Sequence, residues 1–127
     1  MIVVDTSALM AILLAEDCAE SCAEVIAQAT GLQMSGGTMA ECMVVAARRG
    51  LRFEMGRLMN GIDLEIVEVT ADRARQVGEA YARWGKGFHP AGLNFGDCFA
   101  YALARERGAT LLFVGDDFSR TDVKSAR

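Results

Sequence analysis

Histidine and paired cysteines are scarce in this sequence of 127 residues. Its one histidine, His89, lies in a glycine-rich stretch, and none of its four cysteines forms a Cys-x-x-Cys pair. Cys18 and Cys22 would share a helix face, but no histidine or second cysteine pair accompanies them to complete a zinc site. The sequence also offers no serine–histidine pair for nucleophilic catalysis, and none of its cysteines has neighbours that would activate it as a nucleophile. We therefore expect small, buried, reduced cysteines, and any chemistry must rest on other side chains.

Long apolar runs and an excess of positive charge are absent as well. The longest charge-free apolar stretch, Thr6 to Ala15, is far too short to cross a bilayer, and no basic segment of a secretory signal precedes it. We expect a cytoplasmic protein without a membrane partner. The net charge is −4, whereas proteins that hold nucleic acid by charge alone are usually basic. This excludes a simple coating protein but not an enzyme whose acidic side chains hold metal ions.

Apolar residues make up 52% of the chain, which suits one packed domain over residues 1–127. The only proline falls in a loop at 85–94. Apolar patterning and capping residues predict an alternation of strands and helices. The expected strands are 2–4, 32–35, 64–69 and 110–114, and the expected helices are 6–14, 16–29, 38–49, 53–61, 71–84 and 96–107. Strands separated by helices predict an α/β fold with a parallel sheet covered on both faces.

Acidic residues stand at the expected strand ends and helix starts. Asp5 follows the first strand, the pair Asp116 and Asp117 follows the last, Asp97 opens a helix, and Glu41 lies in the first turn of another. Ligands of such sheets bind beyond the carboxyl ends of the strands. Carboxylates gathered there repel one another, and a divalent cation that prefers oxygen, such as Mg²⁺, offsets the repulsion. Such a site suits hydrolysis of a phosphodiester.

Each acid also has a purely structural interpretation. Asp5 could cap the first helix, and Glu41 could complete a capping box with Thr38, which the local sequence favours over catalysis. Asp97 could complement a helix dipole, and the acidic pair at 116–117 could be a surface turn. The placement of all these acids at one inferred edge nevertheless favours a functional site.

Four segments together resemble the PIN domain of VapC toxins, over essentially the whole chain. They are MIVVDTSAL at the start, TMAE at 38–41, LNFGDCFAYALA at 93–104 and LLFVGDDF at 111–118. The last two are highly specific, whereas a strand ending in Asp-Thr-Ser alone is weak. The resemblance implies a three-layer α/β/α sandwich and cleavage of RNA that depends on Mg²⁺ or Mn²⁺. It also implies a homodimer and a VapB-like antitoxin, so that the chain would be the toxin of a VapBC-type toxin–antitoxin pair.

The resemblance also implies roles for individual acids. By position, Asp5 and Asp97 correspond to the metal ligands and Glu41 to the third acid. The fourth acid is less clear, because many relatives carry it at a position that is glycine here. We take Asp117, just before a phenylalanine, as the fourth acid and Asp116 as its possible substitute. A second departure is the glycine pair at 36–37, where relatives often have proline, which would loosen the approach to Glu41.

Three other functions stay open at this point. An aspartyl phosphatase needs a second aspartate two residues after the nucleophile, where this chain has Ser7. A response-regulator receiver needs an acidic pair after the first strand, but only Asp5 stands there. A binding-only PIN relative would have lost its acids, which are present here. Metal-dependent cleavage of RNA would distinguish these classes.

Basic and methionine side chains are candidates for partner contacts. Phosphate recognition needs cations beside the acids, and Arg120 is the best placed in the sequence. The candidates are Arg48, Arg49, Arg52, Lys86 and Arg120. Methionines on helices suit a surface that adapts to a second subunit or an antitoxin, although core filling is the better explanation for any single one. They are Met10, Met39, Met43, Met55 and Met59.

Overall fold

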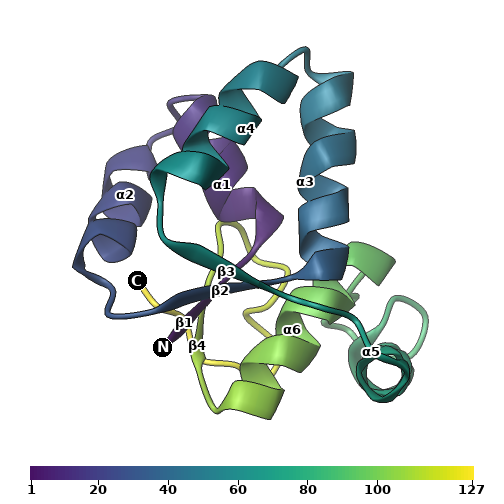
Figure 1. Cartoon of the computed structure of the whole chain (residues 1–127). Helices are drawn as coiled ribbons and strands as arrows, with labels where there is room; N and C mark the ends of the chain where they lie inside the picture. Colours follow the sequence, from purple (N-terminus) through teal and green to yellow (C-terminus); the bar gives the residue numbers. More distant parts are fainter.

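The computed structural model describes every residue from Met1 to Arg127, and Figure 1 shows a sheet between two layers of helices. The strands are β1 (Ile2–Val4), β2 (Leu32–Ser35), β3 (Leu64–Val67) and β4 (Thr110–Leu112). The helices are α1 (Thr6–Leu13), α2 (Ala19–Gln28), α3 (Gly36–Arg48), α4 (Arg52–Gly61), α5 (Ala71–Trp84) and α6 (Phe95–Arg107). The four strands are all parallel, in the order β3-β2-β1-β4. The expected α/β class and parallel sheet are confirmed.

Two apolar cores lie on opposite faces of the sheet. Val3 and Leu111 pack in one core with α5 and α6, and Val4 and Leu112 pack in the other with α1 to α4. Neighbouring residues of β1 and β4 thus point to opposite faces, as the pleat of a strand requires. Figure 1 shows the same division, with α5 and α6 below the sheet and the other helices above it.

Helix boundaries follow local capping chemistry. Thr70 caps α5 by accepting a hydrogen bond from the backbone of Arg73 at 3.2 Å, as its sequence position predicts. Gly108 ends α6 in the left-handed conformation, with φ of 60°, also as expected. The start of α3 is different from the expectation, because the Ser35 side chain accepts from the backbone of Gly37 and begins the helix at Gly36.

The capping box predicted for Thr38 and Glu41 is therefore wrong. Both residues lie inside α3, and Glu41 is in its second turn rather than its first. The Thr38 hydroxyl is buried without a hydrogen-bond partner, so it caps nothing. Glu41 therefore takes no part in capping α3.

The segment after β4 folds back onto the sheet. The strand ends at Leu112, earlier than expected, so the acidic pair at 116–117 does not follow it directly. The backbone N–H of Leu111 donates to Lys124, and that of Ala126 donates to Leu111. Phe118 is fully buried in the core formed with α5 and α6. The tail thus covers the outer edge of β4, while β3 forms the other edge, as its partly exposed pattern predicts.

Most sulfur-containing side chains fill the cores. Cys22, Cys42 and Cys98 are buried and all cysteines are free, as expected. Among the methionines considered for partner contacts, Met10, Met55 and Met59 are buried, Met39 is half-buried and Met43 is exposed. No helix is long and apolar enough to span a membrane.

Candidate active site

Asp5 joins the end of β1 to the start of α1. Its Oδ2 accepts hydrogen bonds from the backbone N–H of Ser7 at 3.0 Å and from the Ser7 hydroxyl at 2.6 Å. The predicted capping role is therefore correct, but it uses only one carboxylate oxygen. Asp5 Oδ1 is buried and has no hydrogen-bond partner. A buried carboxylate oxygen without a donor is costly unless a proton or a cation meets it.

Ser7 connects Asp5 to the far side of the site. While its hydroxyl donates to Asp5, the same oxygen accepts from the backbone N–H of Val114 at 3.0 Å. Val114 belongs to the segment that leads from β4 to the acidic pair. One side chain thereby fixes both the orientation of the Asp5 carboxylate and the start of the segment that carries Asp117.

Asp97 is held at the start of α6 by a reciprocal capping box. The Asn94 side chain accepts from the Asp97 backbone at 2.8 Å, and Asp97 Oδ2 accepts from the Asn94 backbone at 3.0 Å. The position of Asp97 in the first turn of α6 suits the expected complement to the helix dipole, but the capping box itself was not predicted. Asp97 is 6% exposed, and this bond leaves its other oxygen available to a ligand.

Glu41 reaches the same place from α3. Its Oε1 accepts a hydrogen bond from the Thr6 hydroxyl at 2.6 Å, across 35 residues of sequence. Its other oxygen, Oε2, lies against Gly96, in space that a Cβ at that position would fill. A glycine at the start of α6 therefore lets this helix approach Glu41.

The neighbouring glycine contact is reciprocal. The Phe99 ring of α6 occupies the space where Gly37 of α3 would carry a Cβ. The glycine pair that departs from the relatives thus does not loosen the approach to Glu41. It lets the starts of α3 and α6 lie in direct contact.

The carboxylates lie near enough to one another to shift their pKa values. Burial, together with the charges of Asp5, Asp117 and Glu41, raises the pKa of Asp97 to about 7, although the hydrogen bond from Asn94 opposes this. Burial, with a smaller contribution from the charge of Glu41, raises the pKa of Asp5 to about 6, against the hydrogen bonds from Ser7. Both carboxyl groups therefore hold their protons far more tightly than an exposed aspartate does.

The acidic pair divides into two unlike residues. The charge of Asp117 is among the causes that raise the pKa of Asp97. The backbone carbonyl of Asp116 accepts hydrogen bonds from the backbone and the hydroxyl of Ser119, at 3.1 and 2.7 Å. The arrangement thus brings Asp5, Glu41, Asp97 and Asp117 together and leaves Asp116 in a surface turn.

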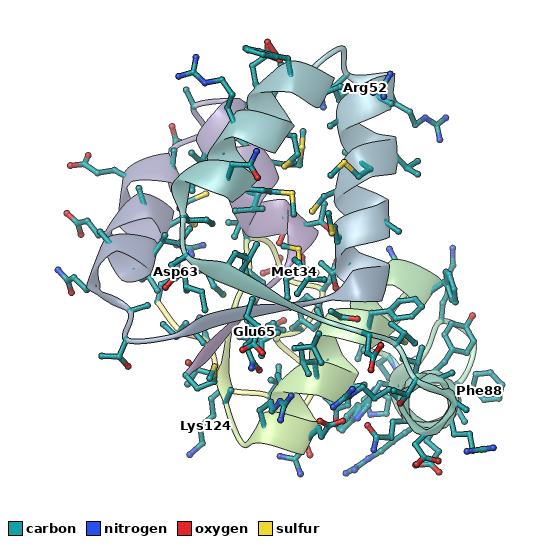
Figure 2. The ribbon with its side chains drawn as sticks, viewed as in Figure 1. Met34, Arg52, Asp63, Glu65, Phe88 and Lys124 are labelled. Carbon is teal, nitrogen blue, oxygen red and sulfur yellow. The ribbon has the colours of Figure 1, made fainter.

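The basic candidates are farther from this cluster. Arg52 begins α4, beyond the end of α3 that is remote from Glu41, as Figure 2 shows. Arg48 and Arg49 lie at that same remote end. Lys86 and Arg120 are exposed, and only Arg120 follows Asp117 within the same turn region.

Sequence reasoning did not find the residues that hold the acids in place. Thr6, Ser7, Asn94 and Gly96 carry no charge. Ser7 and Asn94 contact their acids from two and three residues away, whereas Thr6 and Gly96 meet Glu41 across the fold. Asn94 could have been found, because asparagine three residues before aspartate at a helix start matches a capping box. The contacts of Thr6 and Gly96 with Glu41 leave no local signal.

The donor set fits a hard divalent cation, although the side chains do not form a ready-made cage. As they lie, no three His, Cys, Asp or Glu side chains are close enough to hold an ion together. Mg²⁺ needs less than that, because it commonly binds through one or two carboxylates and keeps several waters. Two carboxylates fit such an ion. Asp5 has an oxygen, Oδ1, without a hydrogen-bond partner, and Asp97 has a raised pKa, so that a cation would stabilise its charged form.

Comparisons with known proteins agree on one family. The PIN domain family model matches residues 2–124. Ribonuclease VapC42 of Mycobacterium tuberculosis is 40% identical over 131 aligned positions, which cover 98% of each chain. The crystal structure of M. tuberculosis VapC20, titled a sarcin–ricin loop cleaving toxin, superposes with a TM-score of 0.76 at 21% identity, covering 97% of this chain and 96% of the other.

A toxin–antitoxin complex from Klebsiella pneumoniae has the same fold. It superposes with a TM-score of 0.74 at 18% identity and covers 100% of this chain and 98% of that one. These structural likenesses establish the fold. The 40% sequence identity to VapC42, over nearly the full length of both chains, establishes that the two proteins belong to one family. The chain therefore belongs to the PIN-domain family and, within it, to the VapC ribonucleases of toxin–antitoxin systems.

Proposed function

We propose that this chain is a Mg²⁺- or Mn²⁺-dependent RNA endonuclease and the toxin of a VapBC-type pair, acting in the cytoplasm. The observation that carries the proposal is the buried, partnerless Oδ1 of Asp5, next to carboxylates that raise one another's pKa. Such a cluster is unfavourable by itself and favourable around a divalent cation. Family membership supplies the class of reaction, which is hydrolysis of RNA.

The proposal gives each acid a separate role. Asp5 and Asp97 would hold the metal ion, which when bound polarises the phosphoryl oxygen and stabilises charge on the leaving oxygen. Glu41 is the candidate general base, because Thr6 occupies its Oε1 and Oε2 is free to accept a proton from the attacking water. Asp117 would complete the negative field that attracts the cation.

The proposal also includes the partners. A cluster of carboxylates repels an RNA backbone in the absence of metal, so a cation beside it is required, and Arg120 is the side chain best placed for this. We propose a VapB-like antitoxin whose basic side chain neutralises the same carboxylates, and a homodimer of this chain.

The direct test is cleavage of an unstructured RNA by the purified chain with Mg²⁺, with Mn²⁺ and with a chelator. We expect cleavage with either ion and none with the chelator. Asp97→Asn should lose nearly all activity and bind Mg²⁺ more weakly in calorimetry. The matched control is Asp63→Asn, an exposed aspartate that precedes β3 at the opposite edge of the sheet (Figure 2), which should cleave like the wild type. Full activity of Asp97→Asn would refute the assignment.

A further inference from the structure

An apolar groove borders the carboxylate cluster on one side. It lies between the starts of α3 and α6 and has a volume of about 320 Å³. Its lining residues are Gly37, Ala40, Glu41, Val44, Phe95, Gly96 and Phe99. Glu41 is the only charged side chain among them, and it also belongs to the carboxylate cluster. The groove and the cluster are therefore continuous.

The rim of this groove carries an aromatic ring held in one orientation. Phe95 is 72% exposed, which is unusual for a phenylalanine in a folded domain. The Phe99 ring meets it edge to face, with the centroids 5.0 Å apart and the planes at 83°. Phe99 is itself held against Gly37. Phe99 thus supports the Phe95 ring on one side, while most of the surface of Phe95 remains open to solvent.

The chemistry of the groove selects among the parts of a nucleic acid. Its lining holds no cation and one carboxylate, so a phosphate would be repelled there. A flat, uncharged base fits an apolar groove with an exposed ring, and bases stack on aromatic side chains when they are unpaired. A phosphodiester bound at the carboxylates places its two flanking nucleosides next to the cluster, within reach of a surface that shares Glu41.

We propose that Phe95 is the stacking platform for the base of an unpaired nucleotide beside the scissile phosphate. This inference rests on the proposed ribonuclease function and specifies its substrate as RNA whose base at that position is free of a duplex. Phe99 is a positioning residue, because its ring packs edge to face against Phe95 and supports it at the rim of the groove. Duplex RNA keeps the same base stacked and paired, and is therefore a poor substrate.

The test is a cycle that changes both members of the proposed stack. The cleavage site of the wild type is first mapped on an unstructured oligoribonucleotide, and a series is then made with a single abasic site at each position near it. Removing the base that stacks should slow wild-type cleavage about five- to 100-fold, the range expected for a base on an aromatic ring. Phe95→Ala should lose a similar factor on intact RNA and lose little more on the abasic RNA. Phe95→Trp should retain cleavage and the abasic penalty.

The control is Phe53→Ala, because Phe53 is exposed to the same extent, 71%, but lies in the first turn of α4, beyond the far end of α3. It should leave both cleavage rates unchanged. If the wild type cleaves RNA but Phe95→Ala shows the full abasic penalty, the stacking proposal is wrong. If Phe95→Ala converts a dimer to a monomer in light scattering and its activity returns at high protein concentration, the groove binds a second copy instead. Failure of the wild type to cleave any RNA would overturn the proposed function itself.

Discussion

The Glu41 carboxylate of α3 lies against the backbone of Gly96 in α6, in the space where any other residue would carry its Cβ. Because the atom that would be displaced is the end of a flexible side chain, Gly96→Ala should change the free energy of unfolding little. It should nevertheless move Glu41 and slow RNA cleavage about tenfold or more, which corresponds to 1.4 kcal/mol of barrier per decade. Glu41→Gln, which keeps the shape but weakens the base, should show a similar loss.

The control for this pair is Gly78→Ala in α5, where nothing lies within 4 Å of the added carbon. It should stabilise the chain by about 0.5–1 kcal/mol, because alanine favours a helix over glycine. Its cleavage rate should equal that of the wild type. If Gly96→Ala cleaves RNA at the wild-type rate, the position of Glu41 is not critical for cleavage.

The stability of the metal-free protein should depend on pH through Asp5 and Asp97. Their pKa values in the fold, about 6 and about 7, exceed the ordinary value of 3.8, so the folded chain holds protons that the unfolded chain releases. The free energy of unfolding should therefore fall as pH rises from about 4 to 7, by on the order of 1–3 kcal/mol for each group. Thermal melting with a chelator, at a series of pH values, measures this.

Asp97→Asn provides the specific check on that dependence. Asparagine resembles the protonated acid, so the variant should melt near the wild type at pH 4 and several degrees above it at pH 8. Mg²⁺ should narrow the difference at pH 8, because it binds the deprotonated wild-type site. An offset that is the same at both pH values would mean that Asp97 is not the group that titrates.

The two members of the acidic pair should behave differently. The charge of Asp117 raises the pKa of Asp97, whereas the Asp116 carbonyl accepts a hydrogen bond from Ser119 in a surface turn. Asp117→Asn should therefore weaken Mg²⁺ binding in calorimetry and reduce cleavage, while Asp116→Asn should be nearly neutral in both. The reverse order of effects would make Asp116 the fourth acid.

Oligomeric state is a separate prediction. The apolar side chain of Met43 on α3 is 40% exposed and suits a contact between copies. We expect light scattering at tens of micromolar to give the mass of a dimer. A monomer at that concentration contradicts the expectation.

Inhibition by the antitoxin should depend on charge at the carboxylates. A peptide from the cognate antitoxin should reduce cleavage, because a guanidinium that pairs with the acids competes with both metal and RNA. The same peptide with every basic residue replaced should lose most of this effect. Undiminished inhibition by the replaced peptide would exclude the blocking mechanism.

Local pattern was sufficient to predict most elements of this fold. The β-branched run at 2–4 and the capped helix at 71–84 have the bounds expected from their residues. The end of β4 was not predictable, because Phe113 and Val114 continue the apolar run. The strand ends since β1 turns into a helix at Asp5, which leaves Phe113 nothing to pair with, and Val114 donates to Ser7 instead.

The candidate site was predictable to the extent that acids mark strand ends. Asp5 and Asp97 were found because their positions follow from local structure. The role of Glu41 was ambiguous, because the sequence offers both Ser35 and Thr38 as caps for α3, and only the structure shows that Ser35 serves. The contacts of Glu41 with Thr6 and Gly96 join residues far apart in the chain, so no local pattern contains them. Ser7 and Asn94, by contrast, orient Asp5 and Asp97 from two and three residues away.

The acids of the site come from both sides of the sheet. Glu41 is carried by α3, which packs with the core of α1 to α4, and Asp97 is carried by α6, which packs with the core of α5. The cluster is therefore complete only when both layers are packed on the sheet. A chain in which only one layer had formed would lack a complete set of acids, so the proposed cleavage would require both cores.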